Sequence, residues 1–376
     1  MHRVLLLGAG KIGSAIARFL AHTGDFDVLV ADQDEVALDH LCSGAPKIDA
    51  LKLDVSNHDA LVKAMKGRHS VVSALTFSLN IGIAKAALES GVSYFDLTED
   101  VATTRAVKAI AREARDGQIF MPQCGLAPGF VSIAAYHLCR DFDRLDEVRL
   151  RVGALPQFPT NEMKYNLTWS TDGLINEYGN PCEAIHEGKL LETLPLEGLE
   201  HFSLDGVDYE AFNTSGGVGT LCETLDGKVR TLNYKTVRYR GHRNLMFFLM
   251  NELRLNDRRA LLKDILESAV PITPQDVVLI FCTVEGYKGR HLIEMTDARK
   301  IYHGQFMGQT CSAIQITTAA SLCAVVDLHA QGKLPTTGFV RQEQVSLDEF
   351  LSNRFGAAYE CNTREPMVRT RSHVTS

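Results

Sequence analysis

Short apolar runs alternate with segments of helical periodicity along the first third of the chain. Apolar residues recur at the spacing of one helix face in segments such as residues 12–20 and 81–90. Strands separated by about ten to fifteen helical residues are typical of βαβ units and a parallel sheet. The strand-like runs lie at residues 4–7, 27–32, 50–55, 70–75, 92–97 and 118–123. The pattern therefore predicts an α/β fold with a doubly wound parallel sheet.

After residue 146 the pattern changes to polar–apolar alternation, which is typical of strands with one covered face. The last of these strands follows the turn GYKGR and is predicted to pair with the strand before it. The alternating stretches are residues 148–155, 231–239, 277–286 and 291–302, with short helices at 172–178 and 243–253. We expect these elements to form an inserted α+β substrate domain with a mixed or antiparallel sheet.

Domain boundaries follow from this change of pattern. We expect a first domain at residues 1–125 and the inserted domain at residues 126–304. Residues 312–330 form one long apolar stretch of helical character, so the chain from about 305 to 360 is predicted to return to the first domain. Residues 361–376 are predicted to form a loose tail.

Composition and charge narrow the functional classes. The chain has 376 residues, with 39 Lys and Arg against 46 Asp and Glu, so its net charge of -7 leaves no basic surplus for nucleic acid. No uninterrupted apolar run reaches the ~18 residues of a membrane span, so we expect no membrane partner. The nine cysteines form no C-x-x-C pair, and the histidines form no H-x-x-x-H or H-E-x-x-H cluster. We therefore expect a cytoplasmic protein without disulfides and without a metal site.

A glycine-rich turn joins the first strand to the first helix. Gly8, Gly10 and Gly13 fit G-x-G-x-x-G, in which the glycines allow a tight turn, a close approach of pyrophosphate and close helix–strand contact. The helix N-terminus then faces the phosphates, and Lys11 and Ile12 lie in the same turn. The alternative is a strand–turn–helix with no ligand. The position between a strand and a helix favours dinucleotide binding.

Asp32 ends the second strand, about twenty residues after the glycine turn. A carboxylate at this point accepts hydrogen bonds from the ribose hydroxyls and repels a 2′-phosphate. No Arg or Lys follows it closely in sequence, so NAD is favoured over NADP. The other strand ends line the same crevice in such a sheet. We expect Asp54 and Val55 near the adenine, and Ala74 and Leu75 near the nicotinamide.

Further motifs follow one another along the chain. They are GAGKIG (8–13), SYFDLTED (93–100), CGLAPGF (124–130), WSTDGLINEY (169–178), FNTSGG (212–217), YKTVRYRGH (234–242) and GFVRQEQV (338–345). In this order they resemble the saccharopine dehydrogenase-like oxidoreductases, which include the lysine 6-dehydrogenases. The resemblance implies an N-terminal Rossmann domain rejoined by C-terminal helices, and a mixed-sheet substrate domain that often dimerises, so we expect a homodimer. It also implies NAD(P)-linked oxidation at a carbon–nitrogen bond of lysine or a lysine adduct.

Oxidation of an amine requires groups that handle protons and charge. The amine must lose a proton before hydride leaves, and the resulting imine is cationic, so a base and a carboxylate are needed. Asp96 ends a predicted strand, and we expect it to hold the ammonium or iminium, with Glu99 as an alternative and helix capping as the plain explanation. His242 is expected to shuttle protons, and Lys235 is a further catalytic candidate. A helix cap would explain His242 without catalysis, and an exposed strand position would explain Lys235.

An amino acid substrate also needs a pocket for its carboxylate. The helix that follows CGLAPGF offers free N–H groups at its N-terminus, and an arginine at a helix start could grip a carboxylate. The substrate-binding candidates are Gly125, Gly129, Trp169, Asp172, Thr214 and Arg243, with Tyr165 and Asn166 behind them. A hinge, core packing or a β-turn would explain these residues without a ligand.

Three functions stay open from the sequence. The favoured one is an NAD-dependent dehydrogenase that acts on saccharopine, and the second is a lysine 6-dehydrogenase that deaminates lysine itself. A polyamine adduct such as carboxynorspermidine is a further related substrate. Saccharopine brings extra carboxylates, so its pocket should hold several cations, and Arg149, Arg151, Arg238, Arg240 and Arg243 are present in the inserted domain. The third is a non-catalytic NAD-binding sensor, which would lose the proton-handling groups.

Overall fold

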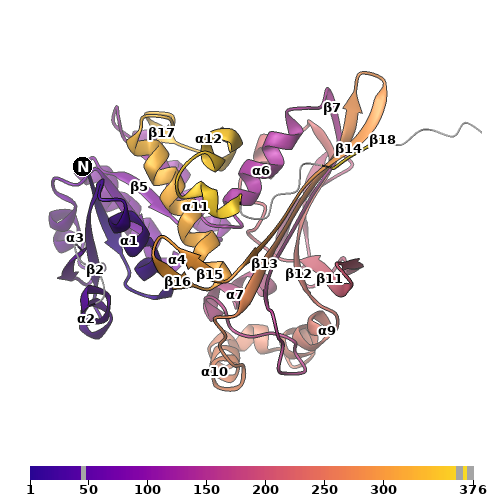
Figure 1. Ribbon diagram of the computed structural model, residues 1–376, viewed down its shortest axis with the longest axis horizontal. Helices are drawn as coiled ribbons and strands as arrows, with labels where there is room; N and C mark the ends of the chain where they lie inside the picture. Colours follow the sequence, from indigo (N-terminus) through magenta and orange to yellow (C-terminus); the bar gives the residue numbers. More distant parts are fainter. Residues whose placement is uncertain (44–47, 361–366, 371–376) are drawn as a thin grey trace, which may run out of the picture. The chain divides into compact units, whose positions relative to one another are not determined.

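The computed structural model describes residues 1–43, 48–360 and 367–370, and the chain divides into two compact units (Figure 1). The first domain contains Met1–Phe130, Gln305–Cys311 and Gln315–Glu360. The second domain contains Val131–Gly304 and Ser312–Ile314, together with the described C-terminal residues Met367–Thr370. The long excursion into the second domain therefore runs from residue 131 to residue 304.

The strands of the first domain form one parallel sheet. They are β1 (His2–Leu7), β2 (Phe26–Asp32), β3 (Ile48–Lys52), β4 (Ser70–Ser73), β5 (Ser93–Asp96), β6 (Ile119–Met121) and β17 (Gly338–Phe339). Their order is β17-β6-β5-β4-β1-β2-β3, which contains the 3-2-1-4-5-6 order of a doubly wound dinucleotide-binding sheet. The predicted sheet is confirmed, and the order reverses between β1 and β4, where such sheets bind ligands.

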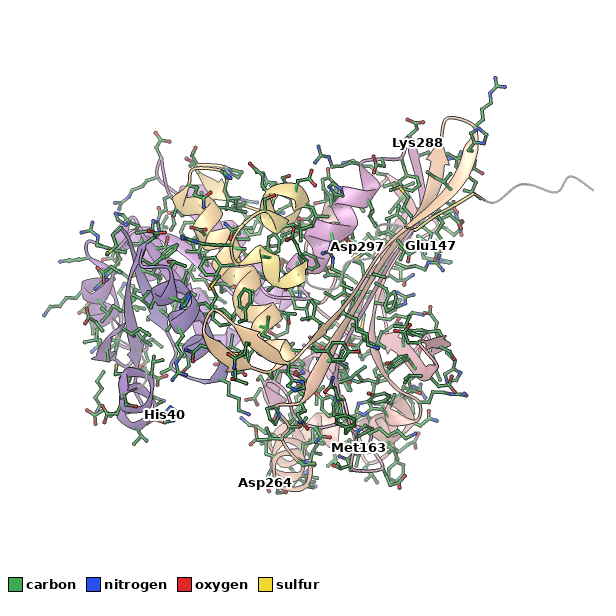
Figure 2. All side chains as sticks on the ribbon, in the orientation of Figure 1. His40, Glu147, Met163, Asp264, Lys288 and Asp297 are labelled. Carbon is green, nitrogen blue, oxygen red and sulfur yellow. The ribbon has the colours of Figure 1, made fainter. Side chains whose placement is uncertain are left out.

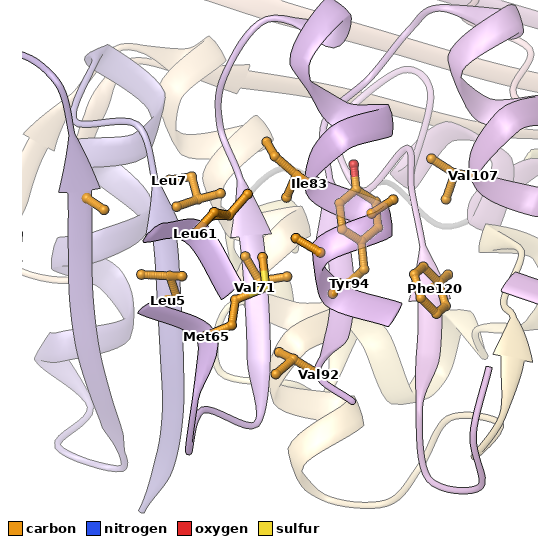
Figure 3. Packing of buried hydrophobic residues seen from close by; sticks show 14 of the residues in the cluster. Leu5, Leu7, Leu61, Met65, Val71, Ile83, Val92, Tyr94, Val107 and Phe120 are labelled. Carbon is orange, nitrogen blue, oxygen red and sulfur yellow. The ribbon is translucent and has the colours of Figure 1, made fainter. Parts of the chain in front are cut away.

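Three helices cover one face of this sheet: α3 (His58–Met65), α4 (Phe77–Ser90) and α5 (Val101–Ile110). Leu5 and Val71 on the strands pack in one cluster with Ile83 on α4, as Figure 3 shows. Because strand side chains alternate between faces, Val4, Leu6 and Val72 are buried on the opposite side. Each fully buried side chain of this kind contributes about 1.5–3 kcal/mol.

The opposite face is covered by α1 (Lys11–His22) and α11 (Ala313–Ala330). The Cys323 thiol on α11 lies 3.9 Å from the Ile16 carbonyl on α1, and the His329 ring lies 5.5 Å from the Phe95 ring on β5. α11 has the length and hydropathy of a membrane span, yet 78% of it is buried inside the structure, as expected for a core helix. The remaining elements are α2 (Glu35–Ser43), α12 (Leu347–Leu351) and the 3-10 turns Ala111–Glu113, Gln342–Gln344 and Gly356–Tyr359.

The second domain is built on a mixed sheet in which β7 and β12 run parallel and the other pairs are antiparallel. Its main order is β10-β11-β12-β7-β13-β14-β18, with the β8–β9 hairpin joined to β12. The strands are β7 (Arg144–Pro156), β8 (Cys182–His186), β9 (Lys189–Thr193), β10 (Glu200–Leu204), β11 (Val207–Asn213), β12 (Val229–Tyr239), β13 (Asp276–Lys288), β14 (His291–Tyr302) and β18 (Met367–Thr370). β15 (Gly304–Phe306) and β16 (Gln309–Cys311) form a separate two-stranded sheet, which belongs to the first domain apart from Gly304.

Most of the loose tail predicted at residues 361–376 lies outside the described residues. The prediction is wrong for β18, which pairs antiparallel with β14 over Met367–Thr370. Backbone pairing with the free edge of a long strand orders a segment whose own sequence carries no strong strand pattern.

Helices of the second domain gather on one face of the mixed sheet. α7 (Thr171–Gly179), α9 (His242–Phe247) and α10 (Arg259–Ala269) lie together at the end marked by Met163 and Asp264 in Figure 2, and Lys288 marks the other end of the strands. α9 continues into a π-helical turn, Phe248–Glu252, and a 3-10 turn, Leu255–Arg258. α6 (Phe130–Cys139) and α8 (Leu221–Thr224) complete the set. The helices predicted at 172–178 and 243–253 are present, whereas α10 was not predicted.

Candidate active site

The glycine turn between β1 and α1 has the shape that the sequence predicts. Gly8 has a φ of +106°, and a Cβ on it would lie 3.0 Å from the Ala74 carbonyl oxygen. A Cβ on Gly13 would lie 2.0 Å from the Gly8 carbonyl oxygen, so α1 can approach the turn only through a glycine. A Cβ on Gly10 would meet nothing within 4 Å, and no side chain caps the start of α1. The turn therefore presents an open backbone surface and the N-terminus of a helix, which suits a pyrophosphate. Lys11 and Ile12 form the first residues of this helix.

Asp32 stands at the end of β2, directly beside the glycine turn. Its Oδ2 accepts a hydrogen bond from the Ala9 N–H at 2.7 Å, and its Oδ1 accepts one from the Asp34 N–H at 3.0 Å. These bonds fix the carboxylate at the place where a nucleotide ribose lies in such domains. The nearest lysine on the neighbouring strand, Lys52, is paired with Glu35 at 3.0 Å. The surroundings of Asp32 thus carry acidic groups and a lysine that is already engaged.

The other residues predicted for the cofactor follow the ends of β3 and β4. The Ala74 N–H donates to the Leu7 carbonyl at 2.9 Å, which fixes the chain after β4 against the glycine turn. Leu75 lies beside Gly8 as well, within 3.1 Å of the Cβ that Gly8 lacks. Asp54 and Val55 follow β3, and hydrogen bonds from Ser56 lower the pKa of Asp54. The structure therefore brings all the predicted cofactor residues to the carboxyl edge of one sheet, and they fit a dinucleotide.

Gly125 and Gly129 close a tight turn after β6. The Gly125 carbonyl accepts a hydrogen bond from the Phe130 N–H at 2.9 Å, and a Cβ on Gly129 would lie 1.9 Å from that carbonyl oxygen. Gly129 also has a φ of +137°. Steric crowding and the positive φ explain the glycine at 129, whereas a Cβ on Gly125 would lie 3.3 Å from the Pro128 carbonyl oxygen. The nearby Cys124 is buried, which raises the pKa of its thiol, as expected for a packing residue.

Asp96 ends β5 as predicted, but it is fully buried. Its Oδ2 accepts from the Tyr94 hydroxyl at 2.6 Å and from the Asn80 amide at 3.3 Å. Its Oδ1 accepts from the backbone N–H groups of Thr98 and Gln123 at 3.0 and 2.9 Å. Burial raises the pKa of Asp96 to about 6. Protein donors occupy this carboxylate, which ties together the ends of β5 and β6, and this argues against the catalytic role predicted for it.

His242 begins α9 as predicted, and it is also fully buried. Its Nδ1 lies 2.9 Å from the Met163 carbonyl, which can only accept, so Nδ1 carries the proton. Nε2 then accepts from the Tyr178 hydroxyl at 3.2 Å. Burial, reinforced by the charge of Arg238, lowers the pKa of His242 to about 3. A histidine held neutral in this way fixes the position of its neighbours, which argues against the proton-shuttle role predicted from the sequence.

Lys235 lies on β12, on the opposite face from Arg238, because the two positions differ by an odd number along a strand. Its ammonium donates to the Gly198 carbonyl and to Glu200, both at 2.5 Å. Burial lowers the pKa of Lys235, and the Glu200 carboxylate opposes that shift. Arg151 binds the same carboxylate with two hydrogen bonds of 2.9 Å. Lys235 is therefore part of an ion-pair group on the sheet and does not join His242.

The substrate-binding candidates of the second domain also lie in different surroundings. Asp172 pairs with Lys263 at 2.6 Å on the surface of α7. Arg243 donates through Nε to the Leu196 carbonyl, and its guanidinium lies 4.4 Å from the centre of the Phe247 ring. Trp169 packs over Gly173, where a Cβ would lie 2.4 Å from the indole. Thr214 is buried, and the structure leaves its hydroxyl without a hydrogen-bond partner among the described residues.

Sequence reasoning gave little weight to a buried polar group around Arg238 on β12. Only 2% of Arg238 is exposed, and its guanidinium lies 5.2 Å from the ring centre of Tyr165 and 5.8 Å from that of Tyr178. The predicted candidates Tyr165 and His242 belong to this group, since their rings lie 5.1 Å apart. The signal in the sequence was the arginine itself, on the strand face that it shares with Leu232, Tyr234 and Thr236. Alternation alone could not show which face of β12 the helices cover.

Two family models together match nearly the whole chain. The model described as saccharopine dehydrogenase NADP binding domain matches residues 4–121. The model described as saccharopine dehydrogenase C-terminal domain matches residues 125–355. The chain belongs to the saccharopine dehydrogenase family. The resemblance seen in the sequence is confirmed, and the first domain is the NAD(P)-binding domain of this family.

Curated relatives of the saccharopine dehydrogenase family match part of the chain. Saccharopine dehydrogenase [NADP(+), L-glutamate-forming] of Schizosaccharomyces pombe is 24% identical over 203 residues, which is 51% of this chain and 44% of that enzyme. Carboxyaminopropylagmatine dehydrogenase of Synechocystis sp. is 28% identical over 158 residues, 39% of this chain and 40% of that enzyme. These alignments span less than half the length of either relative.

A solved structure agrees with the fold over the full length. Apo histidine-tagged saccharopine dehydrogenase (L-Glu forming) from Saccharomyces cerevisiae superposes with a TM-score of 0.76 and covers 99% of this chain and 100% of that chain. The two are 16% identical, so the likeness shows the fold alone. It confirms the expected architecture, a dinucleotide-binding domain with an inserted mixed-sheet domain.

Proposed function

We propose that this member of the family is an NAD-dependent oxidoreductase that acts on a carbon–nitrogen bond of a lysine-derived amino acid, as a saccharopine dehydrogenase does. One observation carries the proposal: the Asp32 carboxylate is held beside an open glycine turn at the start of α1. NAD, when bound, supplies the hydride acceptor. The names of the relatives, which include saccharopine and carboxyaminopropylagmatine dehydrogenases, support chemistry at a carbon–nitrogen bond.

The residues around Asp32 support NAD over NADP, although the matching family model and the yeast relatives are named for NADP. The Asp32 carboxylate can accept hydrogen bonds from a ribose 2′-hydroxyl and repels a 2′-phosphate. Lys52 is the lysine placed next to it in the sheet, and its ammonium pairs with the Glu35 carboxylate at the surface. A 2′-phosphate would therefore meet a net negative surface. The chain's own contribution to the chemistry is to seat the pyrophosphate on α1 and to orient the ribose through Asp32.

Oxidative deamination of lysine itself is the second candidate, and the arginines of the second domain favour it. Saccharopine carries more carboxylates than lysine and needs more free cations. Arg149 is bound by Glu294 at 2.7 Å, Arg151 by Glu200, and Arg240 lies 3.7 Å from Asp208. Three of the five arginines considered for a polyanionic substrate are thus occupied by the protein's own carboxylates.

Absorbance at 340 nm tests the function directly. The protein is mixed with NAD or NADP and with saccharopine or lysine at alkaline pH, and Asp32→Ala serves as the matched control. We expect NADH to form with NAD and one of the two amines, and the control to need much more NAD. Formation of NADPH in preference to NADH would contradict the cofactor choice. Tight NAD binding without any turnover would favour a non-catalytic sensor.

A further inference from the structure

We propose that Arg238 is the residue that binds a carboxylate of the substrate, inside the helix-covered half of the second domain. The inference rests on the proposed function, because it assumes an amino acid substrate. In this proposal Arg238 takes the role that the sequence suggested for Arg243. The site differs from the catalytic positions suggested for His242 and Lys235.

The five arginines of the inserted domain fall into two groups. Four of them have protein acceptors for their guanidinium groups or lie at the surface: Arg149, Arg151, Arg240 and Arg243. Arg238 differs, since it is 2% exposed and no ion pair with a carboxylate within the distance of a salt bridge is seen for it in the described part of the chain. Its Nη1 donates to the Val237 carbonyl at 2.8 Å, and its Nε has no hydrogen-bond partner among the described residues.

A buried guanidinium with an unused donor is costly, because charge and N–H groups taken from water need partners. The faces of Tyr165 and Tyr178 supply part of the compensation through cation–π contacts. The Glu177 carboxylate on α7 adds a favourable charge. None of these contacts uses the Nε–H, and a carboxylate is the partner that the planar fork of an arginine fits best.

Other buried polar atoms lie on the segments that carry Tyr165 and Tyr178, and on the loop after β11. Within the described chain the Thr214 hydroxyl and the amide Nδ2 of Asn176 have no hydrogen-bond partner, while the Tyr165 hydroxyl lies beside Thr168 and Trp169. The segments that carry them meet, because the Ser215 N–H donates to the Glu177 carbonyl at 2.9 Å and so fixes the loop after β11 against α7. Buried polar atoms are normally paired, so the unpaired Nε of Arg238 and unpaired donors on the segments that meet at α7 fit a ligand with several acceptor lone pairs. A carboxylate has about four such sites.

His242 and Tyr178 keep the guanidinium in place. The neutral imidazole holds the Tyr178 hydroxyl, which in turn fixes the ring that lies against Arg238. The His242 ring is itself held by the carbonyl of Met163, which is labelled in Figure 2. These contacts fix the position of the Arg238 guanidinium. This gives the otherwise unexplained buried histidine a positioning role.

Steady-state kinetics with a substrate and its decarboxylated analogue tests the assignment. For a lysine substrate the analogue is cadaverine, which keeps the reacting amine and lacks the carboxylate. We expect Arg238→Gln to raise KM for lysine by about 10- to 100-fold, as the loss of a charge-assisted hydrogen bond predicts, and to leave KM for cadaverine unchanged. Arg238→Lys should recover part of the loss. Arg240→Gln, at an arginine exposed next to the same strand, should change neither value.

Folding and function are checked separately. Where Arg238→Gln does not fold, Tyr165→Phe decides, because it removes only the hydroxyl of a ring that lies against Arg238. A raised KM for lysine supports the site and an unchanged KM overturns it. If the wild type oxidises no amine, the proposed function fails, and calorimetry with L-lysine and L-glutamate still tests the site. Binding that Arg238→Lys weakens would support it. Equal KM changes for lysine and cadaverine, or no binding by the wild type, would overturn it.

Discussion

Alanine at Gly13 should lower the stability of the protein, whereas alanine at Gly10 should leave stability nearly unchanged and weaken NAD binding. A Cβ on Gly13 would lie 2.0 Å from the Gly8 carbonyl oxygen and 2.9 Å from its carbonyl carbon. Backbone atoms cannot rotate away, so α1 must move off β1 by about 1 Å, and overpacking of this kind costs about 1–3 kcal/mol. We expect Gly13→Ala to lower the first thermal unfolding transition clearly.

Gly10 offers the matched control. It has a φ of -69°, which alanine adopts freely, and a Cβ there meets no atom within 4 Å. The loss of a favourable N-cap and the reduced freedom of the unfolded chain are opposing effects of about 1 kcal/mol or less each, so the melting temperature should hardly change. The added methyl group nevertheless occupies the place of the pyrophosphate, so we expect NAD affinity to fall at least about tenfold, or 1.4 kcal/mol.

Differential scanning calorimetry and NAD titration calorimetry on both variants separate the two effects. The steric account of the turn is refuted if Gly13→Ala melts like the wild type. The account of the site is refuted if Gly10→Ala, still folded, binds NAD as tightly as the wild type does.

Further predictions concern Asp32, Asp276 and His242. Asp32→Ala should weaken NAD binding by about 1–3 kcal/mol and reduce the preference over NADP, as titration calorimetry would show; unchanged affinity would speak against the ribose contact. The buried Asp276 carboxylate accepts hydrogen bonds from the N–H groups of Ala313 and Ile314 at the start of α11. Asp276→Asn should therefore destabilise the protein by about 1–3 kcal/mol at pH 8. A variant that melts at the same temperature as the wild type would contradict this. The pKa of His242 is lowered from 6.5 to about 3, so the unfolded chain binds the extra proton between these values and stability falls as pH drops through that window. His242→Gln should therefore lose less stability than the wild type between pH 6.5 and 4, by up to ~1.4 kcal/mol per pH unit, and parallel stability profiles would contradict this. The variant is compared with the wild type because two buried carboxyl groups act in the opposite direction. The pKa values of Asp96 and Asp276 are raised to about 6, so these groups stabilise the folded protein as pH falls towards 3.8.

Local patterns were enough to predict the first domain. The inner parallel strands β4, β5 and β6 are buried on both faces and therefore appear as short continuous apolar runs, and the glycine turn imposes its own sequence. Asp32 could be placed because its role depends on a short distance along the chain from that turn. The predicted cofactor residues all follow strand ends, and one topological rule brings such ends to the same edge.

Tertiary burial could not be predicted in the same way. Asp96 and His242 looked reactive at strand and helix ends, but packing from distant segments removed both from water and supplied their hydrogen-bond partners. The burial of Arg238 depends on which face of β12 the helices cover. The alternation of polar and apolar residues along a strand does not show which face that is.

One of two hairpins in the second domain carries a strong turn signal in its sequence, Asp205-Gly206. Asp205 and Gly206 join β10 to β11, and both have positive φ angles. Glu187 and Gly188 do the same between β8 and β9. An Asp-Gly pair between alternating stretches is a strong sign of a two-residue hairpin turn.

The proposed cofactor site requires the glycine turn to seat a dinucleotide whose ribose Asp32 holds. Titration calorimetry of the purified wild-type protein with NAD and then with NADP examines this requirement. We expect one NAD bound per chain, with an affinity at least about tenfold higher than that for NADP. Absence of binding for both dinucleotides, or tighter binding of NADP, would refute it.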